Sequence, residues 1–74
     1  MKTVEAVREI MKEQNIGVNK MADRLNRKPN VISERLGQSN ISIVKLSEML
    51  RVLDYKIMLV PRETSTPKSG YEVE

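Results

Sequence analysis

The apolar residues of the chain recur every three to four positions in four short blocks, a period that predicts amphipathic helices. The blocks cover about residues 3–14, 18–25, 29–36 and 43–55. Residues that typically begin or end helices flank these blocks: Thr3, Asn15, Gly17, Asn26, Pro29, Gly37 and Ser42. We therefore expect a mostly α fold, a bundle of four to five short helices.

After residue 55 the apolar spacing changes from helical to extended. Residues 57–60 are rich in strand-forming side chains and are closed by Pro61, so they predict one short strand. Residues 62–70, with Thr, Ser, Pro and Gly, predict a loop, and residues 71–73 are a second candidate strand. We divide the chain into a helical domain, residues 1–55, and a C-terminal strand and tail, residues 56–74.

The composition limits the chemistry of the chain. Its 74 residues suffice for one small domain, and the core must be aliphatic because Phe and Trp are absent. Base-stacking surfaces for RNA or single strands are disfavoured, since they use aromatic faces. Cys and His are also absent, which leaves no thiol or imidazole chemistry. With scattered carboxylates and no glycine-rich loop, we expect neither an enzyme nor a cofactor.

The sequence also predicts a compartment. No apolar run approaches the roughly 20 residues of a membrane span, and the charged residues 1–10 do not resemble a signal peptide. A small fold without disulfides suits a reducing interior. We expect a cytoplasmic protein with no membrane partner.

Positive charge is concentrated in the middle of the chain. The net charge is +3, and residues 20–35 hold five basic and two acidic side chains. Such a cationic stretch favours a polyanionic partner, although a cluster of this kind is also common on solvated surfaces.

The same stretch has the spacing of a helix-turn-helix. Two short helices, 18–25 and 29–36, are joined by a turn of three residues, 26–28. The small side chain of Ala22 lets the second helix pass closely over the first, and Ile32 is placed to enter the core. In this motif the second helix lies in the major groove of DNA.

These residues resemble the XRE family of phage Cro and repressor proteins. The resemblance rests on MADRLN (residues 21–26), VISERL (residues 31–36) and the apolar pattern of residues 41–53, and it covers about residues 3–55. It implies a Cro/repressor-like bundle, usually dimeric, that acts as a transcriptional regulator. Small regulators of this kind from phages and mobile elements carry a short apolar strand and a tail after the helices.

The chain departs from the family pattern at three positions. Val18 stands where the family often has a phosphate-binding Gln, and Asn26 stands where Gly is common in the turn. Pro29 occupies a position near the start of the recognition helix that is usually polar. Direct reading of bases must therefore rest on few side chains.

Helix geometry predicts which side chains reach DNA. Lys28 can reach a guanine edge or a phosphate, Asn30 can pair with adenine, and Glu34 can accept a hydrogen bond from cytosine. Ser33 is placed to touch a phosphate, and Val31 is expected in the core. Each polar residue can also be explained as a simple surface residue. Predicted phosphate contacts are Lys20, Arg27, Arg35, Gln38 and Asn40.

Two partners besides double-stranded DNA are predicted. Residues 57–60 can pair across a two-fold axis or pack with the fourth helix in a homodimer, or they can instead form a hairpin with residues 71–73. The C-terminal segment, residues 62–74, can alternatively bind a partner protein, as in an antitoxin-like regulator of its own promoter. A helical adaptor without DNA contact is a further alternative.

Overall fold

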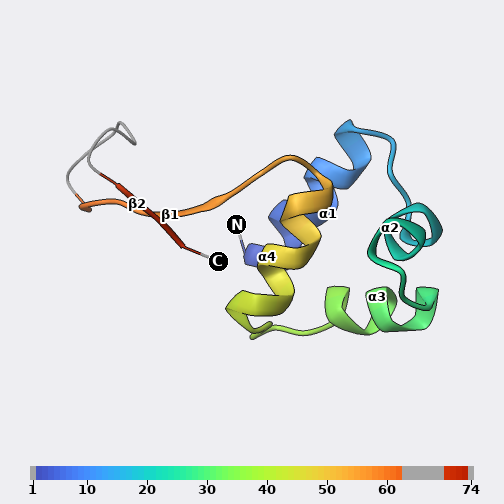
Figure 1. Ribbon diagram of the computed structural model, residues 1–74. Helices are drawn as coiled ribbons and strands as arrows, with labels where there is room; N and C mark the ends of the chain where they lie inside the picture. The colour runs from blue at the N-terminus through green and yellow to red at the C-terminus, as the bar shows by residue number, and fades with distance from the viewer. Residues whose placement is uncertain (1, 63–69, 74) are drawn as a thin grey trace.

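The computed structural model describes residues 2–62 and 70–73, which form four helices and two short strands (Figure 1). They are α1 (Thr3–Glu13), α2 (Val18–Leu25), α3 (Pro29–Leu36), α4 (Ile43–Val52), β1 (Ile57–Leu59) and β2 (Tyr71–Val73). The prediction of a small, mostly helical fold is confirmed. Most of the loop predicted over residues 62–70 lies outside the described residues.

Three of the predicted helix signals act as expected. Asn15 and Asn26 follow α1 and α2 in the left-handed conformation, with φ of 58° and 55°. At the start of α4 the Ser42 hydroxyl accepts a hydrogen bond from the Lys45 backbone N–H at 3.2 Å. These local signals explain why the helix boundaries could be predicted closely.

Other helix ends differ from the prediction. Thr3 is the first helical residue of α1 rather than its cap, and the extended residue before it is Lys2. Gly17 has a φ of −87° and caps the start of α2, so it is not a left-handed stop. α4 ends at Val52 rather than near residue 55, because the chain turns at Asp54 with a φ of 63°. Aspartate is one of the few residues that tolerates this conformation.

The core is aliphatic and draws on all four helices. Met21 and Ile32 are fully buried where α2 meets α3, and Ala22 is 1% exposed beside them. Methionine and leucine side chains from α4 complete the interior, as the helical period predicted. The buried hydrophobic residues are Val7, Met11, Ile16, Met21, Ala22, Ile32, Leu36, Met49, Leu50 and Leu53. We call residues 3–53 the helical body.

The strands form an antiparallel hairpin within the chain. Ile57 is opposite Val73, and Leu59 is opposite Tyr71. The structure thus has the hairpin that the sequence offered as an alternative. One edge of β1 is occupied by β2, so the prediction that this edge pairs with a second copy of the chain is wrong. Directly opposed residues share a face of a sheet, so these four side chains form one apolar face.

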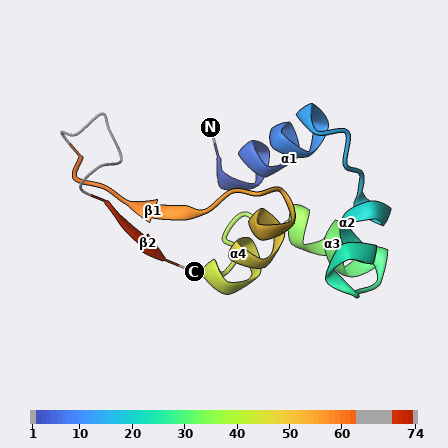
Figure 2. The ribbon, with the colours of Figure 1, turned by 45° about the horizontal axis from the view of Figure 1, so that its top comes forward.

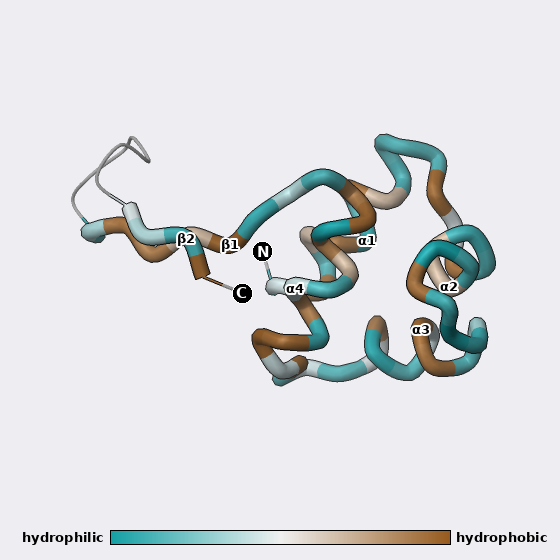
Figure 3. Tube along the Cα trace, viewed as in Figure 1, coloured by the Kyte–Doolittle hydropathy of each residue, from teal (hydrophilic) through white to brown (hydrophobic). Residues whose placement is uncertain are grey.

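The hairpin projects from the helical body on the side away from α2 and α3, in both views (Figures 1 and 2). Hydrophobic segments continue along it beyond the helices (Figure 3). Ile57, at its base, packs against the core, whereas Leu59 and Tyr71 are 59% and 76% exposed. In the described part of the chain, no helix has the length and apolarity to cross a membrane.

Candidate nucleic-acid interface

α2, its turn and α3 have the layout of a helix-turn-helix. Asn26 reverses the chain in the left-handed conformation, and the Arg27 N–H donates back to the Ala22 carbonyl at 2.9 Å. These features end α2 sharply and let α3 begin three residues later. Met21 and Ile32 then fix the two helices against each other from the inside.

The side of α3 opposite the core faces solvent. Lys28, Asn30, Ser33 and Glu34 are all exposed. Val31, which was expected in the core, is only half-buried and belongs neither to the core cluster of the described residues nor to the hydrophobic residues packed against it. The hairpin lies at the far side of the helical body, so within the described residues this face of α3 is left open (Figures 1 and 2).

The remaining predicted phosphate contacts lie on either side of α3. Lys20 is exposed on α2, and Asn40 is exposed in the loop that joins α3 to α4. Gln38, in the same loop, is half-buried. The structure therefore places polar side chains before and after α3, as a helix lying along a duplex groove needs.

The structure does not support the prediction that Arg35 contacts a phosphate. It is 5% exposed, and its Nη1 donates to Glu48 Oε1 on α4 at 2.9 Å. A guanidinium in this position cannot reach a DNA phosphate. The sequence held a signal for this, because Ile32, Arg35 and Leu36 share one face of a helix by their i, i+3, i+4 spacing.

Glu48 is a residue that the sequence analysis missed. Its carboxylate pairs with Arg35 and also with Arg27 Nη2, at 3.3 Å. The hydrogen bond from Arg35, helped by the positive charges of both arginines, holds the pKa of Glu48 below its ordinary value against the opposing effect of desolvation. Its partners lie 13 and 21 residues away, so no local motif could have indicated the contact.

These ion pairs change the electrostatics of the site. Glu48 neutralises the buried Arg35, so the exposed positive charge is smaller than the sequence suggested. It comes from Lys20, Arg24, Lys28 and the Arg27 side chain, which is 42% exposed. All of these lie on α2 or in the turn before α3.

A side chain of α1, Arg8, and the side chain of Gln14 directly after α1 bind the ends of other helices. Arg8 Nη2 donates to the Leu36 carbonyl at the end of α3 at 3.2 Å. Gln14 Nε2 donates to the Leu53 carbonyl after α4 at 2.8 Å. A cation near a helix C-terminus also interacts favourably with the helix dipole. α1 therefore holds α3 from behind while leaving its outer face open.

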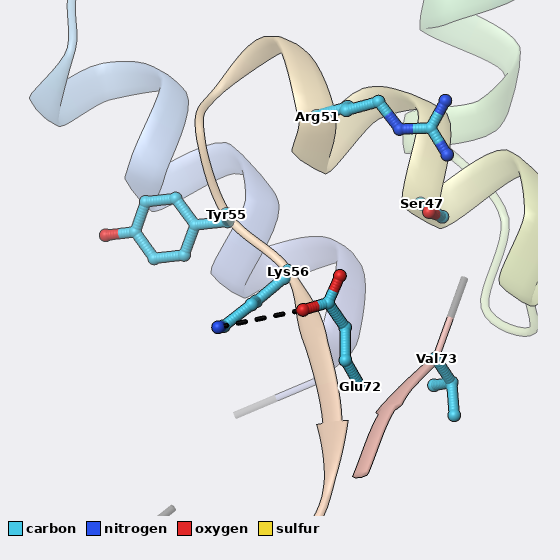
Figure 4. Close-up of a pocket in the computed structure, with 6 residues that line it drawn as sticks. All are labelled: Ser47, Arg51, Tyr55, Lys56, Glu72 and Val73. Atoms are coloured by element: carbon cyan, nitrogen blue, oxygen red, sulfur yellow. Dashed lines mark ion pairs between the residues drawn. The ribbon is translucent and has the colours of Figure 1, made fainter.

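A cavity of about 260 Å³ lies between α4 and the hairpin (Figure 4). Lys56 Nζ lies 3.7 Å from Glu72 Oε1 across it, and both side chains are mostly exposed. Over residues 2–62 and 70–73, no group of three acidic, His or Cys side chains is arranged to hold a metal. The lining residues are Ser47, Arg51, Tyr55, Lys56, Glu72 and Val73.

The chain was compared with protein families, curated proteins and solved structures. No protein family, curated protein or solved structure matches the chain. Functional interpretation therefore depends on the residues and their geometry.

Proposed function

We propose that this chain is a non-catalytic, sequence-specific DNA-binding protein of the XRE type, a cytoplasmic transcriptional regulator that inserts α3 into the major groove. The observation that carries the proposal is the α2–turn–α3 arrangement with the outer face of α3 exposed. A helix of eight residues fixed from behind by a second helix is the shape that enters a major groove in this motif. The repressor role, and an origin in a phage or mobile element, follow from the resemblance alone.

In this proposal three side chains contact the edges of the bases. Asn30 has the bidentate amide that matches adenine, and Lys28 and Glu34 offer a donor and an acceptor at the two ends of the exposed face. Lys20, Arg27, Ser33, Gln38 and Asn40 contact phosphates and set the register.

The proposal includes a homodimer formed through the hairpin. A two-stranded hairpin is marginally stable by itself, and the outer end of its apolar face, Leu59 and Tyr71, has no cover within the described residues. Burying this face against a second copy would stabilise both hairpins. A dimer that holds its two α3 helices about 34 Å apart, one turn of DNA, would read an inverted repeat.

A second candidate is favoured by the same exposed face. In an antitoxin-like autoregulator, Leu59 and Tyr71 would contact a different protein while α3 binds the promoter. Co-purification of a stoichiometric partner that is lost on Leu59→Asp would favour this function. A homogeneous dimer of the chain alone would favour the first.

Selection from random duplex DNA at two salt concentrations tests the DNA-binding proposal. We expect an enriched palindrome, and relaxed selection at one position for Asn30→Ala. Arg51→Ala, on the hairpin side of α4, removes a charge away from α3 and is the matched control. If no sequence is enriched and double-stranded RNA or heparin competes equally, the chain is not a sequence-specific DNA binder.

Sedimentation velocity tests the dimer separately. Leu59→Asp should dissociate it, whereas Val44→Asp, at an equally exposed apolar position on α4, should not. A wild-type chain that sediments as a monomer at micromolar concentration contradicts the hairpin dimer and leaves DNA binding untouched.

A further inference from the structure

Two arginines share the Glu48 carboxylate, and their environments differ. Arg35 makes the shorter contact, 2.9 Å, and its side chain is 7% exposed. Arg27 makes the longer one, 3.3 Å, and its side chain is 42% exposed. One contact is thus enclosed by the helical body and the other is open to solvent.

The charges of this cluster are unequal. One carboxylate faces two guanidinium groups, so a single arginine is enough to neutralise it. If Arg27 leaves, Glu48 and Arg35 remain a matched pair and no buried charge loses its partner. If Arg35 were to leave, its own charge would need a new partner, which is costly away from water. Arg27 is therefore the member that can be exchanged.

Arg27 is also well placed for a second anion. It lies in the turn directly before Lys28 and α3, the end of the recognition helix whose residues contact base edges in this motif. The guanidinium group binds phosphate and carboxylate through the same planar pair of donors. A DNA phosphate can therefore replace the Glu48 carboxylate without a change in the type of contact.

We propose that Arg27 exchanges Glu48 for a DNA phosphate when the chain binds DNA, while Arg35 keeps Glu48. This inference rests on the proposed function. In the free protein Glu48 is a positioning residue, because it restrains a long side chain near the place where the phosphate will lie. Arg27 then acts as a phosphate-binding residue and Arg35 as a fixed part of the fold.

The salt dependence of binding tests the exchange. The probe is a mixed-sequence duplex of about three helical turns, and each phosphate contact contributes about 0.9 to the slope of log K against log salt. Arg27→Ala should make the slope shallower by about 0.9 per subunit, and Arg27→Lys should restore it because the charge is kept. Arg51→Ala is the control for loss of one arginine and should leave the slope near that of the wild type.

A second measurement follows the exchange directly. In nuclear magnetic resonance spectra of the free protein, side-chain contacts of Glu48 to both arginines should be present. On addition of the duplex, the Arg27 contact should disappear and the Arg35 contact should persist. Persistence of the Arg27 contact, or an unchanged salt slope for a folded Arg27→Ala chain, overturns the exchange. Failure of the wild type to bind any duplex overturns the proposed function instead.

Discussion

The helical body and the hairpin differ in how far they bury their apolar residues. All ten buried hydrophobic residues of the described chain belong to the helical body, where Met21, Ile32 and Met49 are fully enclosed. The hairpin leaves Leu59 and Tyr71 mostly exposed on one face. The body can thus be stabilised by its own contacts, whereas the outer face of the hairpin gains little from the chain itself. In the proposed function, DNA recognition belongs to the helical body and association belongs to the hairpin.

The charged residues show the same contrast. The Glu48 side chain is 28% exposed and lies 2.9 Å from a buried arginine. The Glu72 side chain is 66% exposed and lies 3.7 Å from a lysine that is 63% exposed. An ion pair shielded from water interacts more strongly than one in solvent. Paired substitutions in the two regions can therefore test whether they differ energetically as they do structurally.

The largest difference is expected for apolar truncation. Ile32→Ala should lower the free energy of unfolding by about 2–5 kcal/mol, because it opens a cavity between α2 and α3. That is a large share of the stability of so small a domain. Leu59→Ala should change the unfolding of the monomer by less than about 0.5 kcal/mol. Urea unfolding followed by circular dichroism measures both, at dilution where any dimer has dissociated. Equal losses would show that the hairpin is part of the folding unit.

The next effect is expected at the buried end of the charge cluster. Glu48→Gln leaves the Arg35 guanidinium buried without its carboxylate and should cost about 2–3 kcal/mol. This is below the range for fully buried pairs, because the Glu48 side chain is partly exposed. The same urea experiment measures it. A change below about 0.5 kcal/mol would place this pair in the same class as the exposed pair of the hairpin.

Acid should remove the contribution of Glu48. Because the folded pKa of this carboxyl is lowered by Arg35 and then Arg27, the unfolded chain binds the proton first as the pH falls. The stabilisation is therefore complete above the ordinary pKa of glutamate, about 4.3, and is lost as the pH falls through the folded value. Unfolding energies of wild type and Glu48→Gln should converge as the pH falls through the lowered folded pKa of Glu48. A gap that stays constant with pH would contradict the assigned cause.

The sequence predicted the helical body well because its signals are local. Asn26, Pro29 and Ser42 each act on the few residues beside them, and the helical period identified the apolar core positions. The helical period also placed Arg35 on the buried face of α3, but a charged side chain is expected at the surface unless its partner is known. Its partner Glu48 lies on another helix, and no pattern within one helix identifies such a pair.

The hairpin was less predictable for a related reason. Residues 57–60 have the pattern of a strand, but this pattern does not specify which other strand they pair with. The sequence left the pairing of residues 57–60 with residues 71–73 as one of two alternatives, and the structure has this pairing, with Leu59 opposite Tyr71. The exposed face of α3 was predictable from periodicity, whereas the reduction of its surrounding positive charge by Glu48 required the fold.

The smallest effect is expected for the exposed ion pair of the hairpin. Glu72→Gln removes the same charge as Glu48→Gln. The carboxylate of Glu72 lies 3.7 Å from the Lys56 ammonium group, however, and both side chains are open to solvent. Exposed pairs of this kind contribute about 0–1 kcal/mol, and salt screens them. Urea unfolding at low and high salt should detect a change of at most a few tenths of a kcal/mol. A larger loss that persists in high salt would mean that the hairpin is enclosed in solution, and the association proposed for it would be the first explanation to test.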